Sequence, residues 1–434
     1  MYSRQGFSFM RFRVLNFLGL FVIPFALSPF LIAQVADSTF YLHDGDTVVF
    51  YGDSITEQRY YTQDVDVYTV TRFPHMQVQF FNAGVGGDRV SGGSAGPIDV
   101  RLPRDVFAHK PSVITIMLGM NDGSYKPLTP EIEGAYTQGY EHILTSLQEA
   151  LPGVRISLLG PSPYDEVTRA EMFPGGYNST LTRFSKIDSE LAKKHNATYI
   201  DLNAPFVASI KKGVAIDPLA TELIVPDRVH PEPTAHWLMA AAILKCWHAP
   251  SLVSSTTLDA KQLSVIDATN SHVSNLTGSE SEVSWTELDD ALPLPFDGKN
   301  VGNHFLFEIS DIEQDLDQQR LIVRGLAAGS YQFTIDGTPI ATFTDSELAK
   351  GVNLANFGTP MRGQAYRVSW LIRDRDDAHY VRLRMFVNEM KNGIPAEPGA
   401  KDLTQFEQQL QKQIYEAAQP RPHTYQIKAI TNPN

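Results

Sequence analysis

The most informative part of the sequence is the run Thr47-Val48-Val49-Phe50-Tyr51-Gly52-Asp53-Ser54-Ile55-Thr56. Its first five residues are apolar or β-branched with little period-2 alternation, which is typical of a strand buried on both faces. The apolar run breaks at Gly52, and a serine follows two residues later. This pattern predicts a buried strand that ends in a turn, with Ser54 just beyond the end of the strand.

Similar apolar runs alternate with longer amphipathic segments from residue 47 to residue 248. Strands are predicted at 47–52, 77–82, 112–119, 155–160 and 197–202. Helices are predicted at about 62–72, 130–150, 178–195 and 233–248. Thr129 followed by Pro130 supplies an N-cap with proline at the first helical position. This alternation predicts an α/β fold, a three-layer parallel sheet with helices on both faces.

The character of the sequence changes after Pro250. Residues 251–285 are rich in Ser and Thr, and Asp336-Gly337 lies between two apolar runs, which predicts a β-hairpin. Two long helices are predicted near 360–391 and 400–419. We therefore expect an α+β accessory region over residues 251–434, with β-hairpins followed by long helices, packed over a first domain at residues 34–250.

The N-terminus has the pattern of an export signal. Three arginines within residues 4–13 precede an apolar stretch over residues 14–33, and Ala33 is a plausible cleavage site, with Ala36 as second choice. We expect residues 1–33 to be a signal peptide and the protein to be exported, to the periplasm or outside the cell. The alternative is an uncleaved membrane anchor, because the stretch is about long enough to span a bilayer.

The charge balance restricts the possible partners. The formal net charge is −13, and it is near −16 without residues 1–33, which carry three Arg and no acid. This disfavours nucleic acid and anionic membranes as partners and suits neutral substrates. Cys246 is the one cysteine, so no intramolecular disulfide forms, and its apolar helical surroundings predict a buried small hydrophobe. We find no metal-ligand cluster or nucleotide-binding glycine fingerprint and expect no metal and no cofactor; the oligomeric state stays open.

Three residues together predict acyl-transfer chemistry. Ser54 lies where parallel sheets bind ligands, and the segment Asp227-Arg228-Val229-His230 supplies an acid three residues before an imidazole. A hydroxyl nucleophile needs a base, and the base needs an orienting acid. We therefore predict a catalytic triad of Ser54, His230 and Asp227. Asp53, in contrast, is expected to form a turn or cap a helix.

Two further loops follow the second and third predicted strands. They are Asn82-Ala83-Gly84-Val85-Gly86-Gly87-Asp88 and Leu118-Gly119-Met120-Asn121-Asp122. Glycines allow the backbone to approach a substrate and present N–H groups; the rival interpretation, a phosphate-binding loop, lacks its Gly-Lys-Ser/Thr ending. Asn121 offers a neutral N–H donor for an oxyanion, and its alternative role is that of a turn residue.

Taken in order, these four blocks resemble those of the SGNH subgroup of GDSL-type hydrolases, a serine esterase superfamily. The resemblance covers about residues 45–248 and implies a flavodoxin-like sheet. It assigns roles to five residues, namely nucleophile Ser54, acid Asp227, base His230, and oxyanion-hole donors Gly87 and Asn121 beside the N–H of Ser54. The sequence departs from the family pattern at two places. Because two glycines are adjacent, the oxyanion-hole glycine could be Gly86 instead of Gly87, and Arg89 stands where the family commonly has a small hydroxyl residue.

The resemblance implies a secreted esterase for carboxylic esters, and O-acetyl esters of carbohydrates are the expected substrates. The alternatives are a lipid or lysophospholipid esterase and a noncatalytic binding protein on a hydrolase scaffold. For residues 251–434 two roles stay open, namely a wall or lid of the cleft and a stabilising appendage.

Overall fold

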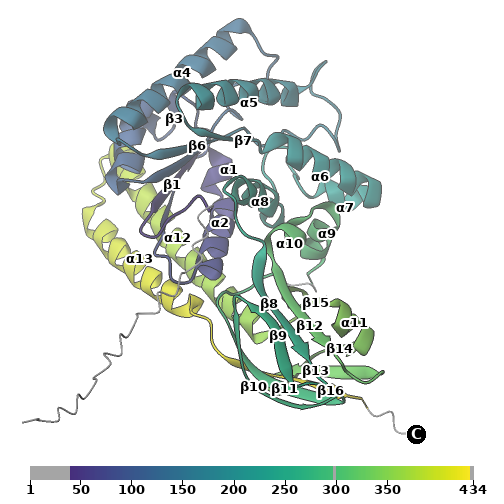
Figure 1. Ribbon diagram of the computed structural model, residues 1–434. Helices are drawn as coiled ribbons and strands as arrows, with labels where there is room; N and C mark the ends of the chain where they lie inside the picture. Colours follow the sequence, from purple (N-terminus) through teal and green to yellow (C-terminus); the bar gives the residue numbers. More distant parts are fainter. Residues whose placement is uncertain (1–39, 297–299, 431–434) are drawn as a thin grey trace, which may run out of the picture. The chain divides into compact units, whose positions relative to one another are not determined.

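The computed structural model describes residues 40–296 and 300–430 (Figure 1). The predicted signal peptide, residues 1–33, lies outside the described residues. Within those described ranges, every helix is too short or too polar to cross a bilayer.

A five-stranded parallel sheet forms the centre of the first part, with strand order β2-β1-β5-β6-β7. Its strands are β1 (Thr47–Gly52), β2 (Gln79–Gly84), β5 (Val113–Met117), β6 (Arg155–Leu159) and β7 (Thr198–Ile200). All five predicted strands are present, and β2 begins two residues later than predicted. Consecutive residues such as Val48, Val49 and Phe50 are buried, as expected for a sheet covered on both faces.

Helices cover both faces of this sheet. Figure 1 shows α4 (Pro130–Ala150) and α5 (Tyr177–Lys194) on one face and α2 (Tyr60–Arg72) and α8 (His236–Cys246) on the other. The predicted three-layer α/β fold is therefore confirmed. Shorter elements complete this part: α1 (Ser54–Glu57), β3 (Gly92–Gly93), β4 (Gly96–Pro97), α3 (Ile98–Arg101), η1 (Leu102–Val106), η2 (Phe107–His109), α6 (Asn203–Ile216), α7 (Pro218–Glu222) and η3 (Pro233–Ala235).

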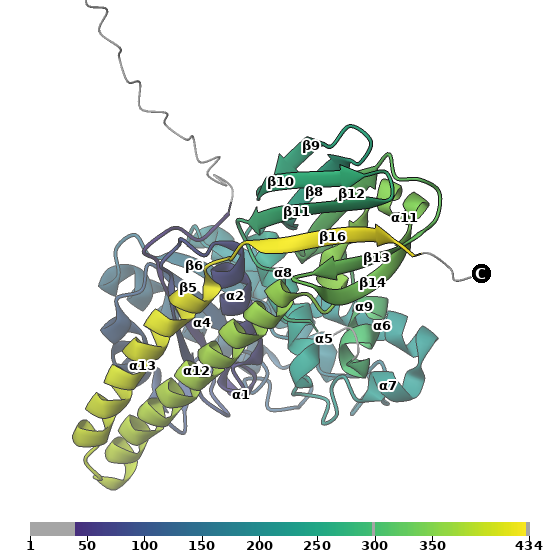
Figure 2. The ribbon, with the colours of Figure 1, turned by 90° about the horizontal axis from the view of Figure 1, so that it is seen from below.

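An antiparallel sheet and a mixed sheet stack in the second part (Figure 2). One sheet has the order β10-β11-β16-β13-β14 and the other the order β15-β12-β8-β9. Their strands are β8 (Leu252–Asp259), β9 (Ser264–Thr269), β10 (Ser271–Ser279), β11 (Glu282–Asp289), β12 (Gln318–Arg324), β13 (Ser330–Ile335), β14 (Thr338–Thr344), β15 (Val352–Asn353) and β16 (His423–Ala429). Trp285 and Phe333 of the first sheet and Leu321 of the second share one buried cluster, so the two sheets form a β-sandwich.

The prediction for this part is confirmed in class and incomplete in detail. The hairpin β13–β14 turns at Asp336 and Gly337, whose φ angles are +50° and +75°, as a type I′ turn requires. Strands β8 to β11 were not predicted. The order of hairpins followed by helices is also incomplete, because β16 follows the helices and lies between β11 and β13.

A long helical hairpin joins the two parts. It consists of α12 (Pro360–Asn392) and α13 (Glu397–Ala418), and α12 contacts α2 and the edge strand β2. Val368 and Ile372 on α12 and Ile414 on α13 belong to the same buried core as Val65 on α2. The core therefore continues across residue 250, where we predict the domain boundary. The remaining helices are α9 (Val301–Ile309), α10 (Ile312–Leu316), α11 (Asp345–Lys350) and η4 (Leu354–Asn356).

Candidate active site

The structure brings Ser54, His230 and Asp227 into one hydrogen-bonded line. Ser54 is the first residue of α1, directly after β1, and His230 lies in the loop between α7 and η3. His230 Nε2 lies 2.8 Å from Ser54 Oγ, and His230 Nδ1 lies 2.6 Å from Asp227 Oδ2. A hydroxyl, an imidazole and a carboxylate at these distances form the arrangement that activates a serine nucleophile.

The turn Gly52-Asp53-Ser54 places this hydroxyl at the carboxyl edge of the sheet. A Cβ on Gly52 would lie 2.1 Å from Thr56 Oγ1, so glycine is what allows α1 to fold back so closely. The buried Asp53 is the N-cap of α1 and accepts a hydrogen bond from the N–H of Ile55 at 3.0 Å. The prediction that Asp53 caps a helix is confirmed, and burial raises the pKa of Asp53 to about 7.

The Asp227 carboxylate binds both the backbone and the ring of His230. Its Oδ1 accepts the backbone N–H of Val229 at 2.9 Å and that of His230 at 2.7 Å, while its Oδ2 faces the ring. Partial burial opposes ionisation, but the hydrogen bonds from His230 and Val229 outweigh it and lower the pKa of Asp227. Asp227 is therefore ionised at neutral pH and orients the ring toward Ser54.

The loop after β2 distinguishes between its two adjacent glycines. The N–H of Gly86 is occupied, because it donates to Glu57 Oε2 at 2.7 Å. Gly87 has a φ of +77° and open space where a Cβ would stand. Among residues 40–296 and 300–430, the N–H groups of Gly87 and Ser54 have no acceptor. This favours Gly87 over Gly86 as a backbone donor to an oxyanion.

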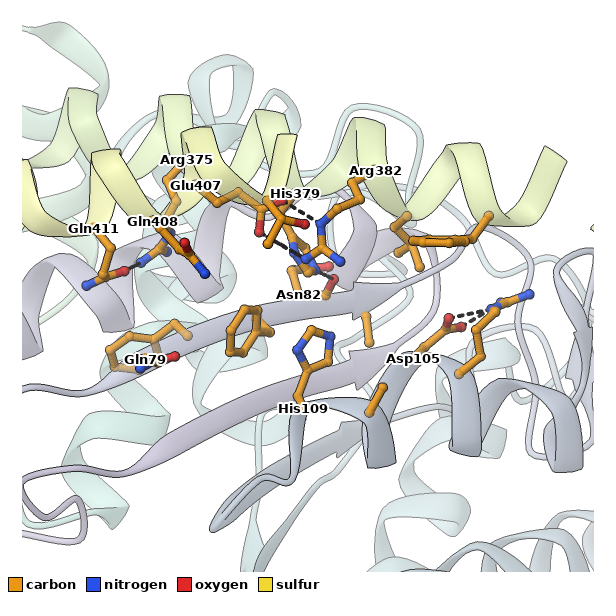
Figure 3. A pocket seen from close by; sticks show the side chains of 18 of the residues that line it. Gln79, Asn82, Asp105, His109, Arg375, His379, Arg382, Glu407, Gln408 and Gln411 are labelled. Carbon is orange, nitrogen blue, oxygen red and sulfur yellow. Dashed lines mark hydrogen bonds and ion pairs between the residues drawn. The ribbon is translucent and has the colours of Figure 1, made fainter. Parts of the chain in front are cut away.

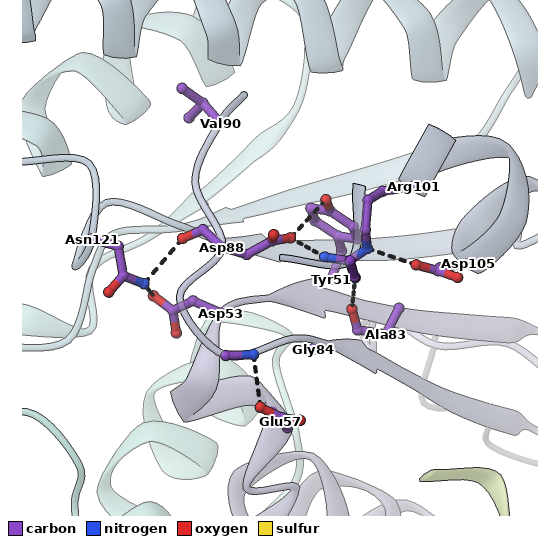
Figure 4. A network of polar contacts seen from close by, with 12 residues as sticks. Tyr51, Asp53, Glu57, Ala83, Gly84, Asp88, Val90, Arg101, Asp105 and Asn121 are labelled. Atoms are coloured by element: carbon purple, nitrogen blue, oxygen red, sulfur yellow. Dashed lines mark hydrogen bonds and ion pairs between the residues drawn. The ribbon is translucent and has the colours of Figure 1, made fainter. Parts of the chain in front are cut away.

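Asn121 lies beside the same loop, as Figure 4 shows. Its Nδ2 donates to the backbone carbonyl of Asp88 at 3.0 Å and lies 3.5 Å from Asp53 Oδ2. The side chain of Asp88 is fixed in position, because its buried carboxylate pairs with Arg101 and accepts a hydrogen bond from Tyr51 at 3.2 Å. The structure therefore brings Asn121 next to the residues that flank Ser54 and Gly87 in the sequence.

A hollow of about 530 Å³ opens beside Ser54. Asp227 and His230 line it, and Tyr380 on α12 forms part of its wall, so the accessory region contributes to the site. The other lining residues come from α1 and its C-cap, from α2, and from the segment between α7 and α8: Glu57, Gln58, Tyr60, Pro226, Pro231, Glu232 and Pro233.

Sequence reasoning missed Glu57 and Tyr380. Glu57 follows Ser54 by three residues on α1, and this spacing places both residues on one side of a helical turn. That spacing was a usable signal for Glu57. No pattern in the sequence indicated Tyr380, because it reaches the site through the packing of α12 against α2.

A larger hollow, about 920 Å³, lies between α12, α13 and β2 (Figure 3). Ser54, Asp227 and His230 are not among the residues that line it. Its buried charges are paired, because Arg382 Nε donates to Glu407 Oε1 at 2.6 Å and Arg375 Nη2 donates to Asp66 Oδ2 at 2.6 Å. We therefore assign the chemistry to the smaller hollow.

Metal and thiol chemistry find little support in the described part of the chain. No group of three His, Cys, Asp or Glu side chains there is arranged to hold a metal ion. Cys246 is half-buried at the end of α8, and burial raises the pKa of its thiol, which disfavours a reactive thiolate.

The fold, with the family match and the relative described next, identifies a carboxylic ester hydrolase of the SGNH type. Residues 50–238 match the model of the GDSL-like Lipase/Acylhydrolase family and form a domain of that family. An acetylxylan esterase from Geobacillus stearothermophilus is 26% identical over 176 residues, which are 40% of this chain and 74% of that protein.

A solved structure extends the similarity beyond the family domain. It is that of a gut microbial diltiazem-metabolizing enzyme, with 26% identity and a TM-score of 0.77. The match covers 90% of this chain and 98% of that chain. A match over 90% of this chain extends well beyond residue 250. The accessory region is therefore part of the architecture that the two proteins share.

Proposed function

We propose that this protein is an exported serine esterase that removes acyl groups, chiefly O-acetyl groups, from carbohydrates. The observation that carries the proposal is the pair of hydrogen bonds, 2.6 and 2.8 Å long, from Asp227 through His230 to Ser54. This chemistry requires no metal and no cofactor.

The reaction proceeds in two displacements. His230 Nε2 takes the hydroxyl proton while Ser54 Oγ attacks the ester carbonyl, and Asp227 stabilises the imidazolium. The N–H groups of Ser54 and Gly87, with the Asn121 amide, bind the tetrahedral oxyanion. His230 then gives its proton to the departing alcohol, and an acyl-enzyme remains. Water activated by His230 attacks this ester, releases the acid and restores Ser54.

Two observations support a carbohydrate ester as substrate. The relative from Geobacillus stearothermophilus is an acetylxylan esterase. The hollow combines polar side chains, among them Gln58 and Glu232, with the rings of Tyr60 and Tyr380. Such a lining suits a neutral ligand with hydroxyl groups and C–H faces, whereas a long acyl chain requires a more apolar channel.

Export is part of the proposal because residues 1–33 carry a basic segment followed by an apolar one. Mass spectrometry of protein recovered from an exporting host tests this step. The mass of a chain that lacks residues 1–33 supports cleavage, and the full-length mass contradicts it.

The central test is an ester panel on the wild type and on Ser54→Ala. The panel runs from acetylated sugars to long-chain acyl esters. We expect the acetylated sugars to be cleaved best and Ser54→Ala to lower kcat by about 10⁶. Ser274→Ala, at an exposed position on β10, is the matched control and should retain full activity.

Other outcomes would favour the alternatives. Preferential cleavage of long-chain esters would indicate a lipid esterase. If a fluorophosphonate probe fails to label Ser54 in folded protein, the chain is a noncatalytic binding protein.

A further inference from the structure

One face of α12 lies against the segment that carries the nucleophile. Asp377, Tyr380 and Arg384 are spaced three and four residues apart, so they share one side of the helix. Asp377 pairs with Arg59 Nη2 at 2.9 Å, and the Arg59 guanidinium lies 4.5 Å from the centre of the Tyr380 ring. Arg384 pairs with Glu57, the last residue of α1.

Glu57 connects this helix to the loop of the oxyanion glycine. One carboxylate oxygen of Glu57 pairs with Arg384, and the other accepts the N–H of Gly86 at 2.7 Å. A Cβ on Gly86 would lie 2.8 Å from Glu57 Oε2 and 3.8 Å from the Cβ of Ser54. The loop is therefore pressed between the carboxylate and the nucleophile, and it continues directly into Gly87.

The ion pair of Glu57 with Arg384 strengthens its hydrogen bond with the N–H of Gly86. A carboxylate held by a guanidinium has its orientation fixed, and its second oxygen stays aimed at the N–H of Gly86. Both partners are largely shielded from solvent, with side-chain exposure of 31% for Arg384 and 16% for Glu57. Without the guanidinium, solvent competes for the carboxylate, and the loop loses the contact that fixes its position.

We propose that Arg384 is a positioning residue that acts through Glu57 to hold the loop of Gly86 and Gly87 in its reactive conformation. The accessory region thereby completes the oxyanion hole of the hydrolase domain. This inference rests on the proposed function of Ser54 and Gly87. It also gives α12 a second role: besides forming part of the wall through Tyr380, the helix fixes the position of a catalytic loop through Arg384.

The test compares Arg384→Met, Arg384→Lys and Glu57→Gln with the wild type on a small acetyl ester. Loss of one oxyanion donor lowers turnover by about 10²–10³, so a misplaced donor should lower kcat by about tenfold or more. KM should change by less than about twofold, because the ground-state carbonyl does not need this donor. Arg384→Lys should recover part of the loss, since it keeps the charge.

Two comparisons separate positioning from a general loss of stability. Arg373→Met makes the same replacement at an exposed position of α12 and should leave kcat unchanged. The double variant Glu57→Gln/Arg384→Met should be no worse than the more damaged single variant, because both act on one contact. Melting temperatures identify a variant that loses activity by unfolding, and Glu57→Gln tests the same link if Arg384→Met does not fold.

Failure of this inference is distinguishable from failure of the proposed function. If Ser54→Ala abolishes activity while folded Arg384→Met and Glu57→Gln keep kcat within twofold, the positioning role is wrong and the esterase remains. Additive losses in the double variant would also overturn the link. If Ser54→Ala retains full activity, the proposed function itself fails.

Discussion

Glu407 on α13 binds two side chains of α12 at once. Its carboxylate accepts Arg382 Nε at 2.6 Å and Nη2 at 2.9 Å, and it lies 3.3 Å from His379 Nδ1 (Figure 3). Burial alone would raise the pKa of Glu407, but the hydrogen bonds from His379 and Arg382 outweigh it and lower the pKa to about 2. The contact therefore stabilises the fold in a way that depends on pH.

We expect Glu407→Gln to change how stability depends on pH. Because the pKa in the folded protein is below the ordinary value of 4.5, the carboxylate contributes stability above pH 4.5 that is lost as the pH falls toward 2. The variant should be less stable than the wild type at pH 7, and the difference should shrink below pH 4.5. Urea denaturation at several pH values measures this.

The matched control for Glu407 is Glu416→Gln on the same helix. Glu416 is 65% exposed and lies 3.8 Å from Lys412, so its loss should change stability by less than about 1 kcal/mol at any pH. A constant difference between Glu407→Gln and the wild type from pH 7 to pH 3 would contradict the assignment.

Local motifs made the residues around Ser54 predictable, but they left one choice open. Gly52-Asp53-Ser54 and the segment from Asp227 to His230 are short stretches, so sequence spacing could predict that their hydroxyl, acid and imidazole lie together, as the structure places them. Gly86 and Gly87 are chemically identical neighbours. The acceptor at Glu57 and the positive φ of Gly87 distinguish them, and both features exist only after folding.

The helix α12 shows how one element can face both the core and solvent. Ile372 is fully buried in the core shared with α2, while Val381 on the same helix is 49% exposed. The ends of α12 were predicted to within one residue. Thr359 caps its start through the N–H of Arg362 at 3.2 Å, and Gly393 ends it with a φ of +64°.

We expect Ile372→Ala to lower the free energy of unfolding by about 2–5 kcal/mol, because it removes buried methyl groups and leaves a cavity. Val381→Ala should change it by less than about 0.5 kcal/mol, as surface substitutions usually do. Chemical denaturation of both variants decides between these magnitudes. Equal effects would show that α12 is not anchored through Ile372.

Strand β11 explains why the sandwich was harder to predict than the helices. Its buried residues alternate, but they are Val283, Trp285, Glu287 and Asp289, so two of the four are acids. Glu287 is accommodated because it accepts hydrogen bonds from Thr256 at 2.6 Å, Ser271 at 2.8 Å and Trp285 Nε1 at 2.6 Å. Buried polar networks of this kind conceal the hydrophobic alternation on which strand prediction depends.

Across the described chain, the hydrolase fold shares its core with the helices α12 and α13, while the β-sandwich has a buried cluster of its own. Val65 on α2 and Ile372 on α12 belong to the same cluster, and Arg72 Nη1 donates to the carbonyl of Pro250 at 2.6 Å. Sequence composition suggested a boundary at residue 250, because Ser and Thr become frequent there. Composition does not report which surfaces come together after folding.

A chain that ends at Pro250 should therefore fail to fold stably. Its α2 would expose the apolar surface that α12 covers, and its active site would lack Tyr380 and Arg384. We expect no cooperative thermal transition by circular dichroism and little esterase activity, compared with a chain of residues 34–434. A stable fragment with unchanged kinetics would exclude a wall or lid role for the accessory region.

The position of β16 determines when its sheet can be completed during synthesis of the chain. This strand comes last among the described elements, yet its neighbours on both sides are made much earlier. On the ribosome, β11 and β13 must wait for it, so the sheet stays divided until residues 423–429 have been made. A chain that ended before His423 would thus leave a strand missing from the middle of this sheet, between β11 and β13.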